Sequence, residues 1–149
     1  MWWSTSPPRR YEIAGEVLAG ALELLQHPAS TATPAGEAVA QAAGQAGRQA
    51  AGQAGRQIAA GGTDLAEVLS RSGYEPKHGP GQSVYLANCP FHELAGRHAS
   101  LVCMMNLHLL LGLIDGLGSR AQARLDPAEG RCCVAIDLPR ASPAPRPGQ

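Results

Sequence analysis

Between Leu101 and Leu117 the chain is apolar on nearly every side of a helix. The large apolar residues of this stretch are Leu101, Val102, Met104, Met105, Leu107, Leu109, Leu110, Leu111, Leu113, Ile114 and Leu117. Such a helix has to be covered on all sides, and one small sheet covers only one of them. The other side therefore needs a second element, for which the first helix of the chain and a second copy of the chain are the two candidates.

Two short hairpins flank this helix in the sequence. The first spans about 74–87, turns at Gly79-Pro80-Gly81 and has strands of roughly five residues. The second pairs Ala123-Arg124-Leu125-Asp126 with RCCVAIDL. Together they predict an α+β fold over residues 63–138, in which a small antiparallel sheet packs on one long apolar helix and N-terminal helices precede it.

The two ends of the chain differ from this unit. Residues 1–34 hold helical spacing over about 9–26, followed by a loop, and they lack the apolar run of a signal peptide. Residues 139–149 contain four prolines, so we expect a disordered tail.

Residues 35–62 contain an internal repeat, because AAGQAGRQ occurs at 42–49 and again at 50–57. Alanine, glutamine and arginine favour a helix, whereas each glycine opposes it by about 1 kcal/mol relative to alanine. Only two larger apolar residues lie in the segment. We therefore expect a marginal helix over about 36–60 that buries little and serves as a solvated connector.

Charge gives no sign of a strongly charged partner. The twelve basic and twelve acidic side chains give no net charge, which argues against direct, strong binding to nucleic acid or to an anionic membrane. Asn106, His108 and Asp115 interrupt the longest apolar stretch, so we expect no membrane span and a cytoplasmic protein. In that compartment the four cysteines are expected to be thiols or metal ligands rather than a disulfide framework.

A cysteine site requires a break in the helix. In one continuous helix over 93–117, Cys103 would lie about 15 Å from the start, too far to share a small site with Cys89. Gly96 to Ser100 offers a break, with Ser100 as the N-cap of a helix that begins at Leu101.

The last strand adds a third cysteine. Alternation along a strand puts Cys132 on the face of Val134 and Ile136, which is expected to meet the helix, and points Cys133 away. Three converging thiolates suit an iron–sulfur cluster or zinc. His92, in the unit Cys89-Pro90-Phe91-His92, or an external group is the candidate fourth ligand, and buried packing cysteines are the simpler alternative.

The segments NCPFHELAGRHASLVCMMNLHLLLGLIDGLG and ARLDPAEGRCCVAI, with PPRRYEIAGEVLAGALE and DLAEVLSRSGYEPK before them, resemble the effector domain of ArsR/DeoR-type winged-helix transcriptional regulators. The group includes the SufR iron–sulfur repressors, and the resemblance covers about residues 7–138. It implies a homodimer and a [4Fe–4S] cluster on Cys89, Cys103 and Cys132, with Cys133 as substitute for the last. It also implies DNA binding only through a winged-helix region, which we do not find before residue 7.

Two functional hypotheses result. The first is a regulatory sensor domain that holds an iron–sulfur cluster, and the second is a zinc-binding structural or dimerisation module without signalling. We expect no enzyme, because no acid that would orient a histidine, no glycine-rich phosphate loop and no paired-carboxylate motif is evident.

Overall fold

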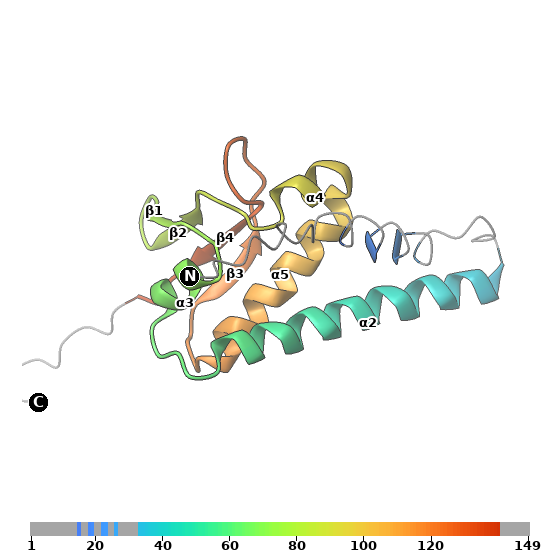
Figure 1. Ribbon diagram of the computed structural model, residues 1–149, viewed down its shortest axis with the longest axis horizontal. Helices are drawn as coiled ribbons and strands as arrows, with labels where there is room; N and C mark the ends of the chain where they lie inside the picture. Colours follow the sequence, from blue (N-terminus) through green and yellow to red (C-terminus); the bar gives the residue numbers. More distant parts are fainter. Residues whose placement is uncertain (1–14, 16–17, 20–21, 24–25, 27–32, 141–149) are drawn as a thin grey trace, which may run out of the picture.

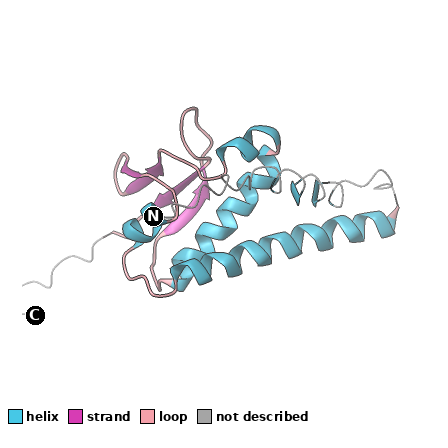
Figure 2. Ribbon diagram, in the orientation of Figure 1, coloured by secondary structure: helices cyan, strands magenta, loops and turns pink. Residues whose placement is uncertain are grey.

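The computed structural model describes residues 15, 18–19, 22–23, 26 and 33–140. Its elements are α2 (Pro34–Ala59), α3 (Leu65–Arg71), β1 (Pro76–His78), β2 (Ser83–Leu86), α4 (His92–Arg97), α5 (Ala99–Gly116), β3 (Gln122–Leu125) and β4 (Val134–Asp137). A small antiparallel sheet packs on one long apolar helix, and further helices accompany them, so the predicted α+β fold is confirmed (Figures 1 and 2). The six described residues before 33 are helical, but most of the expected helix over 9–26 and of the tail lies outside the described residues.

The two hairpins form one antiparallel sheet with the strand order β1-β2-β4-β3. Val84 lies opposite Ile136 where β2 pairs with β4, so the hairpins are joined through their second strands. Each strand has three or four residues, which is shorter than expected. The first turn depends on Gly81, whose φ of 64° lies in the left-handed region that favours glycine.

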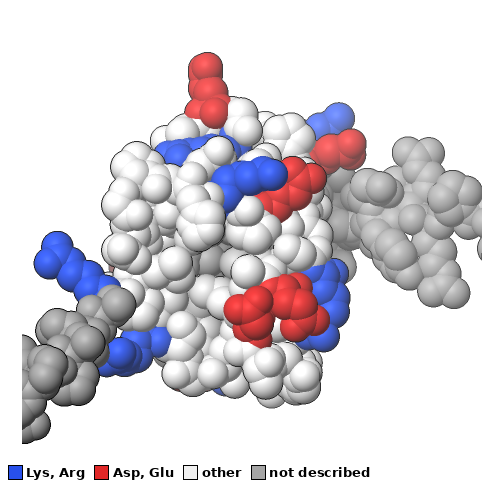
Figure 3. All heavy atoms as spheres, turned by 90° about the vertical axis from the view of Figure 1, so that its left-hand side faces the viewer, with Lys and Arg blue, Asp and Glu red and all other residues white. Residues whose placement is uncertain are grey.

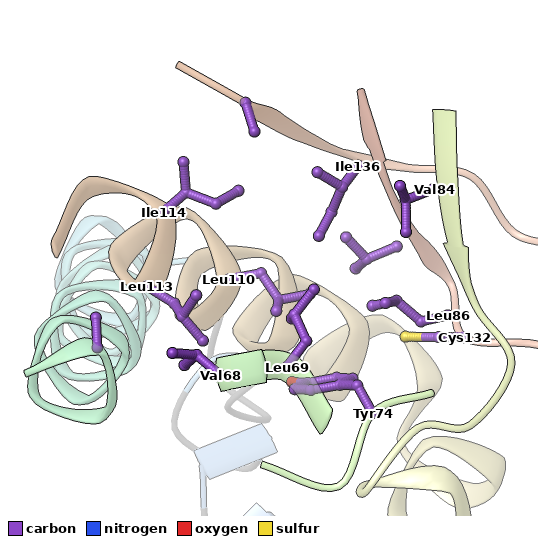
Figure 4. Close-up of a cluster of buried hydrophobic side chains, with 13 residues drawn as sticks. Val68, Leu69, Tyr74, Val84, Leu86, Leu110, Leu113, Ile114, Cys132 and Ile136 are labelled. Atoms are coloured by element: carbon purple, nitrogen blue, oxygen red, sulfur yellow. The ribbon is translucent and has the colours of Figure 1, made fainter. Parts of the chain in front are cut away.

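The main core lies between α5, α3 and one face of the sheet. Leu110 and Leu113 of α5 are fully buried and belong to one cluster with Leu69 of α3 and with Leu86 and Ile136 of the sheet (Figure 4). Burial of each such side chain contributes about 1.5–3 kcal/mol. The sheet and α3 thus cover one side of α5.

The other side of α5 is covered by α2, which we expected to be a solvated connector. The two helices cross near their C-terminal ends (Figure 1). A Cβ atom at Gly55 would lie 1.9 Å from the carbonyl oxygen of Leu109, and one at Gly112 would lie 2.0 Å from that of Gly52. The expectation is wrong because glycine lets two backbones touch, so a helix without large side chains can still cover its neighbour.

Small residues recur along α2 at every fourth position, namely Ala43, Gly47, Ala51, Gly55 and Ala59. Residues spaced by four form a ridge that winds slowly round a helix. The last three are buried where α2 meets α5. Earlier on the ridge, a Cβ at Gly47 would lie 3.5 Å from the side chain of Leu22. The second copy of the repeat therefore contacts α5 through its backbone, whereas the glycines of the first copy lie near Leu22 and Gln26.

A break separates α4 from α5, as a shared cysteine site requires. The break lies at His98, with φ −129° and ψ 46°, inside the expected interval. α5 begins at Ala99, two residues before the expected start, and no side-chain hydrogen bond caps it, so Ser100 is not the N-cap.

α5 is also long and apolar enough to cross a membrane, judged by length and composition alone. Core helices of water-soluble proteins can pass the same test. In this structure α5 lies between α2 and the sheet, which is the position of a core helix.

Candidate functional site: a four-cysteine centre

The four cysteines of the chain meet near the start of α5, and we call this place the four-cysteine centre. Cys89 lies in the loop between β2 and α4, Cys103 lies on α5, and Cys132 and Cys133 directly precede β4. Cys103 and Cys133 form a disulfide with Cα atoms 6.2 Å apart, although the sequence favoured thiols or ligands. Cys89 and Cys132 are free, and their thiol groups are hydrogen-bonded to each other.

The expectation that Cys133 points away from the helix is wrong. It applied strand alternation to 132–137, but β4 begins only at Val134. Cys133 lies at a bend before the strand, where its carbonyl oxygen accepts a hydrogen bond from the Asp126 N–H at 2.7 Å. Because alternation does not extend to this bend, both neighbouring cysteines reach α5.

Nearby N–H groups favour negative charge on the two free sulfur atoms. The backbone N–H of Phe91 lowers the pKa of Cys89, and the N–H groups of Val134 and Cys133 lower that of Cys132. The side-chain Nδ2 of Asn106 also donates to Cys132 Sγ at 3.1 Å, and hydrogen bonds of this kind stabilise a thiolate.

These contacts separate the acidities of the two thiols. The hydrogen bond from Cys89 is the largest cause that lowers the pKa of Cys132 to about 6, with the N–H donors assisting and burial opposing. The same hydrogen bond, together with burial, raises the pKa of Cys89. The shared hydrogen bond and the Asn106 donor therefore favour the thiolate on Cys132 and the thiol on Cys89.

This separation predicts a pH-dependent stability. Cys132 loses its proton at about pH 6 in the folded chain and near its ordinary value of 9.0 in the unfolded chain. Between these values the unfolded chain binds more protons than the folded chain, so the free energy of unfolding should rise with pH. The stabilisation that the Cys132 thiolate contributes should be lost as the pH falls through about 6. Urea denaturation across this range should show the rise in the wild type and a smaller one in Cys132→Ala. An equal rise in both proteins would assign it to other groups.

Asn106 and Tyr74 belong to the site, although neither was among the site residues predicted from the sequence. Asn106 is 2% exposed and is the one buried polar side chain among the described residues. Its Oδ1 accepts a hydrogen bond from the Tyr74 hydroxyl, whose pKa is raised mainly by burial. An amide three residues after Cys103 lies on the same side of a helix, so spacing could have identified Asn106. Tyr74 gave no such signal, because it is 32 residues away from its partner.

The turn before Tyr74 holds the loop that carries Cys89. Asn88 Nδ2 donates a hydrogen bond to the carbonyl oxygen of Gly73 at 2.7 Å. Gly73 has a φ of 96°, and a Cβ atom there would lie 3.3 Å from the ring of Pro90. Asn88 and Pro90, the residues on either side of Cys89, thus both contact Gly73, and this keeps the cysteine close to Tyr74.

His92, the candidate fourth ligand, is not part of any cluster that could hold a metal ion among the described residues. Its side chain is exposed at the first residue of α4, and its backbone N–H donates to the carbonyl oxygen of Cys89 at 3.0 Å. Within the described part of the chain, no three histidine, cysteine or acidic residues take an arrangement that could hold a metal ion. While Cys103 and Cys133 are bonded, only two thiols remain, and reduction of this bond would provide four sulfur atoms in one place.

The surface adds no sign of a charged partner on the face shown in Figure 3. Basic and acidic side chains are mixed there, and neither gathers into a patch. On the outer side of the sheet Arg124 pairs with Asp137 at 2.7 Å and Arg131 with Asp126 at 2.8 Å. No model of a known protein family matches the chain, and no curated protein or solved structure matches it either.

Proposed function

We propose that the chain is a regulatory sensor domain of a transcriptional regulator, whose four-cysteine centre binds an iron–sulfur cluster. The main observation in support is that cysteines from three separate parts of the chain meet at the start of α5. Cys89, Cys103 and Cys132 are the proposed ligands, and Cys133 is the proposed fourth. The role is regulatory rather than enzymatic.

The chemistry of the donors suits a metal–sulfur group. Cysteine thiolates hold iron–sulfur clusters, and hydrogen bonds to their sulfur atoms adjust the reduction potential. The side-chain amide of Asn106 already donates to sulfur here. A bound cluster would supply a one-electron redox centre. Because Cys103 can act as a ligand only when its bond to Cys133 is reduced, the disulfide form and the cluster form exclude each other.

α5 connects the four-cysteine centre with α2, so a structural change at the centre has a path to the rest of the domain. Cys103 lies near one end of this helix, and Gly112 lies near the other end, against α2. Backbones in direct contact have no side chain that could absorb a shift, so a movement of α5 at Cys103 would be passed to α2. A sensor requires two states of this kind, each favoured by a different condition of the centre.

A cytoplasmic homodimer that reaches DNA through a winged-helix region is part of the proposal. The support is the resemblance of the cysteine segments to effector domains with this organisation. Two partly exposed apolar residues of α5 support the homodimer. Met104 and Leu111 are 36% and 37% exposed, and because they lie seven residues apart they share one helix face, which a second copy of the chain would cover. The balanced charge of the chain agrees with DNA contact through another region.

The test is to measure iron, sulfide and zinc in protein purified and reduced without oxygen, together with its visible absorption spectrum. Iron with matching sulfide and a broad visible absorption band should be present in the wild type. They should be lost in Cys89→Ser, Cys103→Ser and Cys132→Ser, because each variant lacks one of the proposed thiolates.

Matched controls use the remaining candidate ligands. His92→Ala should keep the cluster, since His92 is exposed and is not one of the proposed ligands, whereas Cys133→Ser reports whether the fourth sulfur is needed. Stoichiometric zinc without iron would favour the second hypothesis, a zinc-binding structural or dimerisation module without signalling. Protein that takes up neither metal after full reduction would refute both.

A further inference from the structure

A buried polar chain leads from Tyr74 to the free sulfur atoms. The Tyr74 hydroxyl donates to Asn106 Oδ1, and Asn106 Nδ2 lies 3.1 Å from Cys132 Sγ and 3.8 Å from Cys89 Sγ. Tyr74 and Asn106 are each 2% exposed. One carboxamide thus accepts from a phenol on one side and faces two sulfur atoms on the other.

The orientation of this carboxamide decides what the sulfur atoms meet. In the observed orientation both N–H bonds are on the side of the sulfur atoms, where a thiolate accepts them. Rotation by 180° would turn the carbonyl oxygen toward a negatively charged sulfur and would leave a buried N–H group facing the phenol. The Tyr74 hydroxyl opposes this rotation, because in its present role it needs an acceptor at the position of Oδ1.

Tyr74 is itself held in place by the backbone around it. Its N–H donates to the carbonyl oxygen of Leu69 at 3.0 Å, directly after Gly73 with its φ of 96°. Asn88 binds the same turn and precedes Cys89. The phenol and the loop of Cys89 therefore share one anchor, so the hydroxyl has little freedom to follow a rotated carboxamide.

We propose that Tyr74 is a positioning residue, which acts through Asn106 to turn N–H groups onto the sulfur atoms of Cys132 and Cys89. This inference rests on the proposed function for its consequence. N–H donors carry partial positive charge and stabilise the more negative, reduced form of a cluster, so they raise its reduction potential. Tyr74 therefore sets the potential at which the sensor changes state.

The first test compares Tyr74→Phe with the wild type after cluster assembly without oxygen. The variant keeps the aromatic ring and loses only the hydroxyl group, so the cluster should assemble and its reduction potential should become more negative. Tyr85→Phe is the matched control, because Tyr85 lies on β2 with its ring against Arg131, on the other face of the sheet from the core. Its potential should equal that of the wild type.

The second test needs no cluster. In the metal-free protein, the exchange of the Asn106 side-chain N–H protons with water is followed by NMR, relative to backbone amides of α5. Loss of one hydrogen bond, about 1 kcal/mol, should speed this exchange about fivefold in Tyr74→Phe and leave it unchanged in Tyr85→Phe. If no cluster forms in the wild type, the proposed function fails while this exchange still tests the positioning role. Unchanged exchange and, where a cluster forms, an unchanged potential would overturn the inference.

Discussion

Replacement of Gly55 by alanine should lower the free energy of unfolding by about 3 kcal/mol, the upper range for an overpacked core. The added methyl group would lie 1.9 Å from the carbonyl oxygen of Leu109 and 2.7 Å from the backbone nitrogen of Leu113. Neither atom can move without displacing α5, so α2 and α5 would have to separate. The loss should appear although alanine itself favours a helix by about 1 kcal/mol over glycine.

The repeat supplies a matched control for this variant. Gly47 has the same neighbours in the sequence, eight residues earlier, and its Cβ would lie 3.5 Å from Leu22, an ordinary contact distance. Gly47→Ala should therefore leave stability unchanged or raise it by up to about 1 kcal/mol. Urea denaturation followed by circular dichroism compares the two variants. Equal stability of Gly55→Ala and Gly47→Ala would show that α2 does not pack against α5 as described.

Loss of the disulfide should have an effect of similar size under oxidising conditions. The bond joins residues 30 positions apart, and a closed loop of this length stabilises a folded chain by about 3–4 kcal/mol in the loop-entropy model. Cys103→Ser and Cys133→Ser should each lose this stability. The double variant should lose no more than either single one, since all three lack the same bond.

A reducing agent provides the internal control for this experiment. In its presence the wild type should fall to the stability of the variants, because its bond is then open as well. A wild type that is equally stable with and without reductant would show that the cysteines are not bonded in solution. Measurements with and without reductant together establish whether Cys103 and Cys133 are bonded or free when the metal assay begins.

Sequence patterns predicted the parts of the fold that depend on large side chains. The all-round apolar helix required cover on two sides, and the hairpins supplied one of them. The other cover, α2, was missed because its contact uses Gly55 and Gly112, and a residue without a side chain shows no hydrophobic pattern. Glycine has a low helix propensity and is therefore unfavourable in a predicted helix, yet the absence of a side chain is what allows the two backbones to meet.

The site could be predicted in part for a related reason. The break before α5 followed from local residues, and it brings Cys103 to the other cysteines. The direction of Cys133 did not follow, because it depends on the residue at which β4 starts, and strand ends are poorly defined by sequence. The contact between Tyr74 and Asn106 joins distant parts of the chain, so it depends on the tertiary packing that buries Tyr74 in one cluster with residues of α5.

The length of the repeat in α2 has a consequence for how this protein can change. Eight residues are two steps of the four-residue ridge, so gain or loss of one copy leaves the ridge continuous. Each copy adds about 12 Å to the helix and turns its start by about 80° about the axis. The contacts of Gly52 and Gly55 with α5 lie near the C-terminal end of α2 and would be kept. One slippage event in the gene would thus preserve the contact of α2 with α5 and displace the residues that precede α2 relative to α4 and α5, where Glu23 pairs with His98 at 2.9 Å.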